Sequence, residues 1–164
     1  GPAVEKAAKL GDAKAVPLPR PLKGADEPHF SFAGLKSAVL RAHEAGTHRP
    51  EDIAASFQQA VVDCLEDRLE YSLSRIDALG ALVVAGGVAA NDAIRAMLQR
   101  VADKFGMRFV APPHWLCTDN GAMIAWAGAE RFAAGLTDPL DVAARPRWPL
   151  DPDAETVRGA GVKA

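Results

Sequence analysis

A buried strand followed by two glycines and an amphipathic helix constrains the fold of this chain more than any other feature. Residues 81–85 (ALVVA) form an unbroken apolar run, as expected of a strand buried on both faces of a parallel sheet. Gly86 and Gly87 end that strand, Asn91 begins a helix, and residues 107–110 form the next strand. Strand, helix and strand with short links predict a βαβ unit in an α/β fold.

Two helices are expected ahead of this unit. Residues 30–32 (FSF) form a short β-like run, and the helix that follows Gly34 is ended by Gly46. The longest helix begins at Pro50, with acidic residues in its first turn, where the helix dipole favours them. Its apolar residues recur at helical spacing and predict one buried face: Ile53, Phe57, Val61, Cys64, Leu65, Leu69, Leu73 and Ile76.

Composition divides the chain into four segments. Residues 1–29 hold a short amphipathic helix and a connector that we expect to be extended, because its prolines remove amide donors. Residues 30–136 form the main lobe, which includes an apolar helix over residues 121–132 whose alanines and glycines favour close packing. Residues 137–151 are interpreted as a docking tail and residues 152–164 as a disordered tail.

Charge, cysteines and apolar length restrict the classes of function. The 19 Lys plus Arg against 21 Asp plus Glu give a net charge of -2, so RNA contact requires a local basic patch or another subunit. Cys64 and Cys117 lack metal-ligand spacing and are expected to be buried free thiols. The longest apolar stretch, residues 78–90, is too short to span a bilayer, so we expect a cytoplasmic protein without a membrane segment.

The first candidate site is the turn within residues 82–91 (LVVAGGVAAN). Two residues without Cβ let the backbone approach a sugar or phosphate closely, and the amides of the next helix N-terminus face any anion there. The Asn91 side chain can cap the helix or reach a ligand. Tight packing with an ordinary cap explains the same residues.

The second candidate site is the segment 117–125 (CTDNGAMIA), in which Asp119 and Asn120 stand at a helix start. Polar residues at that edge of an open α/β sheet lie where ligands usually bind. Asp119 can be a metal ligand or an N-cap, and one carboxylate cannot make a metal site. We expect His114 at the loop surface and Lys36 either as a solvated charge or in contact with phosphate.

Seven segments occur together in an order and spacing that resemble one family, the universal tRNA threonylcarbamoyltransferases, called TsaD in bacteria. They are GPAVEKAA, PLPRPL, FSFAGLKSAV, DIAASFQQAVVD, LVVAGGVAAN, PPHWLCTDNGAMIAWAG and ARPRWPLD. The resemblance covers residues 1–151 and implies that the chain is the C-terminal half of such an enzyme. The implied fold is an incomplete actin-like ATPase fold (ASKHA, ribonuclease H-like), here one lobe of mainly parallel βαβ strands with a helical insertion.

Four positions match residues with a role in the family. By this resemblance Asp119 is a metal ligand and Asn91 binds the threonylcarbamoyl-adenylate. Gly1 matches the last glycine of a Gly-Gly-Pro turn that lines the adenylate pocket, although Gly1 and Pro2 equally fit the remnant of a cleaved tag. Glu5 matches a ligand contact of some archaeal-type relatives.

The resemblance also implies a reaction, a cofactor and partners. The reaction is transfer of threonylcarbamoyl from threonylcarbamoyl-AMP to the N6 amine of the adenosine 3′ of the anticodon in tRNA. It involves one divalent ion, iron or zinc, and the proteins TsaB and TsaE. Because the family's two metal-binding histidines are missing here, we expect the chain to be inactive without the missing N-terminal half.

Two alternatives remain open. One is another nucleotide-binding enzyme of the same fold, a small-molecule kinase, and the other is an inactive, truncated interaction module. The segment ARPRWP (residues 144–149) places two arginines beside a tryptophan, which can stack on RNA or serve an ordinary docking tail.

Overall fold

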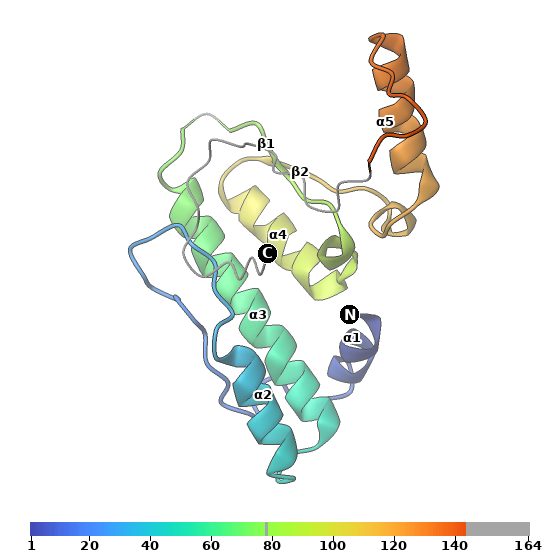
Figure 1. The fold of residues 1–164 in the computed structure, drawn as a ribbon. Coiled ribbons are helices and arrows are strands. Elements are labelled where there is room, and N and C mark those ends of the chain that lie inside the picture. The colour runs from blue at the N-terminus through green and yellow to red at the C-terminus, as the bar shows by residue number, and fades with distance from the viewer. Residues whose placement is uncertain (78, 144–164) are drawn as a thin grey trace. The chain divides into compact units, whose positions relative to one another are not determined.

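The computed structural model describes residues 1–77 and 79–143 (Figure 1). They belong to two compact units, one from Gly1 to Gly121 and one that starts at Ala122. The predicted disordered tail and the ARPRWP segment lie outside the described residues. The helices and strands are α1 (Pro2–Ala8), α2 (Leu35–Glu44), α3 (Pro50–Leu73), β1 (Ala81–Val83), the 3-10 helix η1 (Gly87–Ala90), α4 (Asp92–Lys104), β2 (Arg108–Val110), the 3-10 helix η2 (His114–Leu116) and α5 (Gly121–Ala133).

Helix α3 is the centre of the first unit. It begins at the predicted Pro50, and α1, α2 and α4 all contact it (Figure 1). One side packs against α2 and the connector, and another side packs against α4. The prediction of a single buried face is therefore wrong, because several elements enclose the helix. The residues buried on the side of α2 and the connector are Val16, Leu18, Leu35, Ile53 and Ala60.

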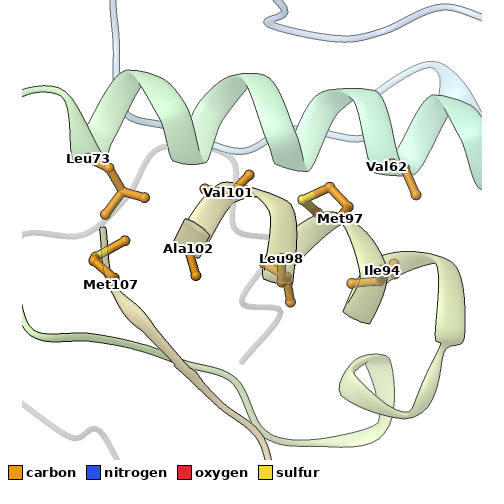
Figure 2. Close-up of a cluster of buried hydrophobic side chains, with 8 residues drawn as sticks. All are labelled: Val62, Leu73, Ile94, Met97, Leu98, Val101, Ala102 and Met107. Atoms are coloured by element: carbon orange, nitrogen blue, oxygen red, sulfur yellow. The ribbon is translucent and has the colours of Figure 1, made fainter. Parts of the chain in front are cut away.

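The second core cluster lies between α3 and α4 (Figure 2). The apolar residues of α4 at helical spacing are buried, as the sequence predicts: Met97 and Val101 lie toward α3, whereas Leu98 and Ala102 point to the other side of α4 (Figure 2). Gly106 follows the helix with a φ of 67°, a left-handed conformation that suits glycine and ends the helix as expected. The buried members of the cluster are Val62, Leu73, Ile94, Met97, Leu98, Val101, Ala102 and Met107.

The connector after α1 contains no helix or strand, as its prolines predict, but polar contacts bind it to α3. Arg68 of α3 is only 2% exposed, and its Nη1 donates to the carbonyls of Ala25 at 2.6 Å and Glu27 at 2.8 Å. The buried Ser56 hydroxyl accepts from the Val16 amide at 3.1 Å. The connector is therefore part of the packed unit.

Strands β1 and β2 pair in parallel and flank α4 in sequence, which confirms the predicted βαβ unit. Leu82 and Phe109 pack toward the cluster between α3 and α4, whereas Val83 is 68% exposed and Val110 is 36% exposed. Because side chains alternate along a strand, these exposed residues lie on the opposite face. The prediction of two buried faces is wrong for the described residues, in which α4 covers only one face.

Residues 30–32 form no strand, which corrects the predicted β-like run. A short apolar segment becomes a strand only when a neighbouring strand pairs with its backbone, and the two described strands pair with each other. Phe30 and Phe32 are about half exposed, at 48% and 43%. Cys64 and Cys117 are buried and free, as expected.

Helix α5 matches its predicted bounds within one residue. It buries none of its residues, and Ile124 and Trp126 are 77% and 71% exposed. The described part of its unit contains no second helix or strand against which α5 could pack. In the part of the chain that the structure describes, no helix is both long and apolar enough to cross a membrane.

Candidate functional site

Both candidate segments leave the sheet at the same edge. The parallel strands end at paired residues, Val83 of β1 opposite Val110 of β2. The Gly-Gly turn and η1 follow the first strand, and the loop that contains η2 and Asp119 follows the second. The carboxyl edge of a parallel sheet is where ligands of open α/β folds usually bind.

The glycine turn is required by backbone conformation and not by packing. Gly86 has a φ of 84°, which disfavours residues with a Cβ. A Cβ added to Gly86 or Gly87 would meet no other protein atom within 4 Å. The explanation that these glycines permit tight packing is therefore wrong for this turn, and their open side leaves room for a ligand.

Asn91 is the N-cap of α4, and both ends of its amide are engaged. Its Oδ1 accepts from the Ile94 amide at 3.0 Å, and its Nδ2 donates to Gln58 Oε1 of α3 at 3.0 Å. One lone pair and one N–H remain for other partners. The side chain is half-buried, so the cap is confirmed while a ligand contact by the remaining groups stays a prediction.

Helix α1 brings Glu5 to the start of α4. The Glu5 carboxylate accepts from the Asp92 amide at 2.8 Å, directly beside Asn91. Lys9 Nζ lies 3.1 Å from the Asp92 carboxylate; this hydrogen bond and its charge lower the pKa of Asp92, and the same bond raises the pKa of Lys9. Gly1 is exposed, and its carbonyl accepts from the Glu5 amide at 3.2 Å at the first turn of α1.

The loop after β2 exposes Asp119 to solvent, while the nearby Cys117 is buried. Asp119 is exposed, whereas Cys117, two residues earlier, is 2% exposed. His114 is exposed as predicted, and its Nε2 lies 3.9 Å from Asp92 Oδ1. Asn91 is thus half-buried and Asp119 is exposed, so neither of these two predicted site residues is enclosed in apolar surroundings.

Arg95 joins the two candidate segments and was not found from the sequence. From the first turns of α4 its Nε donates to the carbonyl of Ala89 in η1. Its Nη2 donates to the Pro112 carbonyl at 2.6 Å and to Cys117 Sγ at 3.1 Å in the other loop. In the sequence Arg95 resembles any polar residue of an amphipathic helix, and Gln58, the partner of Asn91, was missed for the same reason.

The described residues do not form a metal site by themselves. They contain no group of three His, Cys, Asp or Glu side chains placed to hold an ion. Asp119 fits a single oxygen ligand, exposed at the sheet edge. Its role as metal ligand stays a prediction that needs ligands from outside these residues.

Lys36 lies on α2, away from the elements that carry Asn91 and Asp119. It lines an apolar hollow of about 450 Å³ together with Phe32, Leu35, Val39, Phe57 and Val61. Residues 144–149 (ARPRWP), whose two arginines and tryptophan allow either RNA stacking or an ordinary docking tail, lie outside the described residues.

Comparison with known proteins assigns the family. The family model of TsaD, tRNA N6-adenosine threonylcarbamoyltransferase, matches residues 1–126. The chain belongs to the TsaD family. Its similar relatives carry the same name: that of Sphingopyxis alaskensis is 73% identical over 164 residues, that of Erythrobacter litoralis is 69% identical over 164 residues and that of Novosphingobium aromaticivorans is 66% identical over 165 residues.

The alignments with these three relatives cover all of this chain but only about half of each relative. The alignments include 100% of the chain and 48%, 48% and 47% of these three proteins. Within the chain, the TsaD match includes both candidate segments, with Asn91 and Asp119. The family assignment thus applies to the part of the chain that holds the candidate site.

Proposed function

We propose that this chain is the C-terminal half of an enzyme that transfers threonylcarbamoyl from threonylcarbamoyl-AMP to the N6 amine of the adenosine 3′ of the anticodon in tRNA. The observation that supports this most is the TsaD match over residues 1–126. The similar relatives are named tRNA N6-adenosine threonylcarbamoyltransferases. No observation favours a small-molecule kinase.

The start of α4 is the proposed binding site of the adenylate. The first amides of a helix and its positive dipole end attract a phosphate. Because Gly86 and Gly87 have no Cβ and an open side, the nucleoside can come close to their backbone. Asn91 has one N–H and one lone pair left to bind the nucleoside. Gly1 and Glu5 would line the same pocket, because Glu5 lies against the Asp92 amide.

Asp119 is proposed as one ligand of a divalent ion, iron or zinc. Its carboxylate is exposed in the loop that leaves the same sheet edge as the glycine turn. When bound, such an ion supplies positive charge against the phosphate and polarises an oxygen of the substrate. The other ligands would come from the missing N-terminal half.

The residues of this chain would contribute by binding and orientation. In the transfer, the N6 nitrogen bonds to the carbamoyl carbon, the bond from that carbon to the phosphate oxygen breaks, AMP leaves and the amine loses a proton. A substrate held in register by the glycine turn and Asn91 lowers the entropic barrier to that attack. We also propose an actin-like fold for the whole enzyme, a cytoplasmic location, and tRNA, TsaB and TsaE as partners.

The test uses the complete enzyme with threonylcarbamoyl-AMP and tRNA. Asp119→Asn keeps the size of the side chain and is expected to lower kcat/KM by about 100-fold or more, the effect of losing a group that holds the reacting substrate. Asn91→Asp keeps the cap acceptor and removes the donor, so it should raise KM for threonylcarbamoyl-AMP while the fold remains.

Asp103→Asn is the matched control, since Asp103 is an exposed carboxylate in the last turn of α4. It should leave kcat and KM within about two-fold of wild type, as surface substitutions usually do. Full activity of Asp119→Asn would remove Asp119 from the site. A wild-type enzyme that transfers no threonylcarbamoyl would overturn the proposed function.

A further inference from the structure

One guanidinium group connects the two segments of the candidate site. Arg95 lies on α4, one turn after Asn91. Its Nε donates to the Ala89 carbonyl in the segment after β1, and its Nη2 donates to Pro112 O at 2.6 Å and Cys117 Sγ at 3.1 Å after β2.

The contacts of Arg95 flank the residues proposed to bind substrate. Ala89 precedes Asn91 by two residues, and Cys117 precedes Asp119 by two residues. Ala89 is 0% exposed and Cys117 is 2% exposed, so both anchor points are fixed in the interior while Asp119 remains accessible. The Cys117 thiol also donates toward the Pro113 carbonyl at 3.5 Å, a contact within the same loop.

The planar fork of arginine suits this bridge. Donors on different sides of the guanidinium reach acceptors in different directions at once, which a single ammonium group cannot do. Two of the acceptors, the Ala89 carbonyl and the Cys117 sulfur, belong to buried residues, so these bonds satisfy groups that have little access to water. The bridge therefore resists relative movement of the two segments.

We propose that Arg95 is a positioning residue that sets the separation between the glycine turn with Asn91 and the loop with Asp119. This inference rests on the proposed function, because it assigns Arg95 an effect on the same substrate site. Arg95 acts through the two segments and not by contact with the substrate. Loss of a supporting hydrogen bond or a displacement of about 1 Å costs roughly 10- to 100-fold in affinity or rate.

The test compares Arg95→Ala and Arg95→Lys in the complete enzyme, with Arg100→Ala as the matched control. Arg100 lies on the same helix, is 59% exposed and pairs with Glu66 at 3.3 Å. The measurements are kcat and KM for threonylcarbamoyl-AMP, the unfolding midpoint, and activity with and without low-millimolar guanidinium. The unfolding curve of each variant gives the fraction of folded enzyme under the assay conditions.

Arg95→Ala should lower kcat/KM by about 10- to 100-fold at full folded fraction, and guanidinium should restore part of that loss. Arg95→Lys should fold and stay impaired, since lysine cannot span both carbonyls. Arg100→Ala should match wild type with and without guanidinium.

Three results would overturn the inference while wild type is active. They are wild-type kcat/KM in Arg95→Ala, wild-type kcat/KM in Arg95→Lys, and a loss in Arg95→Ala that equals its unfolded fraction and does not respond to guanidinium. If wild type itself transfers nothing, the proposed function fails first and the inference fails with it. The wild-type measurement therefore separates the two failures.

Discussion

The carboxylate of Glu5 accepts a hydrogen bond of 2.8 Å from the backbone amide of Asp92 and so joins α1 to the first turn of α4. An acidic side chain at this place satisfies an orphan amide and interacts with the positive end of the helix dipole. Glu5→Ala is therefore expected to lower the free energy of unfolding of this chain by about 1 kcal/mol in urea titrations.

Glu44→Ala provides the control, because Glu44 is an exposed carboxylate at the last turn of α2. The free energy of unfolding of Glu44→Ala should stay within about 0.5 kcal/mol of wild type. Equal stability of Glu5→Ala and wild type would show that the bond to Asp92 contributes nothing in solution.

Asn91 should contribute to stability mainly through its oxygen. Asn91→Ala removes the acceptor for the Ile94 amide and should cost about 1 kcal/mol, whereas Asn91→Asp keeps that acceptor and should cost less. Urea unfolding of both variants measures the difference. If both substitutions cost the same, the contact of Nδ2 with Gln58 and not the cap dominates.

Arg68 is expected to be the most costly arginine to replace. Its buried guanidinium donates hydrogen bonds to the carbonyls of Ala25 and Glu27, and its Nε donates to the Asp67 carboxylate at 2.9 Å. Arg68→Met would remove all these bonds at a side chain that is 2% exposed, and it should lower the unfolding free energy by about 3 kcal/mol. Arg75→Met is the control: the Arg75 side chain is 52% exposed, and its removal should cost less than about 1 kcal/mol.

Gly11 should not tolerate a side chain. A Cβ at this position would lie 2.0 Å from the carbonyl oxygen of Glu51, so the segment that follows α1 would have to move away from α3. Gly11→Ala is expected to cost about 1 to 3 kcal/mol in thermal or urea unfolding. Gly80→Ala, where a Cβ meets nothing within 4 Å, should be neutral or slightly stabilising. Similar effects of both substitutions would contradict the close approach of Gly11 to the first turn of α3.

The thiol of Cys64 predicts a loss of stability at alkaline pH. Burial raises the pKa of Cys64 above its ordinary value of 9.0, so the unfolded chain loses the proton first as the pH rises. The stabilisation is complete below the unfolded pKa and is lost as the pH rises through the folded pKa. Cys64→Ala should therefore show a smaller fall in unfolding free energy between pH 8 and about pH 11 than wild type.

Other groups contribute to the same alkaline loss, so it should not vanish in Cys64→Ala. The hydrogen bond to Asp26 raises the pKa of Tyr71, and the hydrogen bond to Asp92 raises the pKa of Lys9. Tyr71→Phe measures separately how much of the alkaline loss of stability comes from Tyr71. An unchanged pH slope in Cys64→Ala would show that the thiol ionises alike in the folded and unfolded states.

The sequence by itself determined the elements and the place of the candidate segments. The apolar run from Ala81, the cap at Asn91 and the stop at Gly106 predicted the βαβ unit, because these signals are local and act within one or two turns. The parallel pairing then followed from the short links. The family could also be inferred from the order of seven motifs, and the match over residues 1–126 confirmed it.

Only the tertiary structure decided which faces are buried and which polar groups meet. The stripe on α3 suggested one buried face, yet α3 is buried on more than one side and buries Arg68. The apolar run of β1 suggested two buried faces, yet Val83 is exposed. Burial depends on the elements that surround a segment. Arg95 and its acceptors in two loops are up to 22 positions apart in sequence. A hydrogen bond between such residues leaves no spacing pattern, so the bridge at the candidate site appears only once the chain is folded.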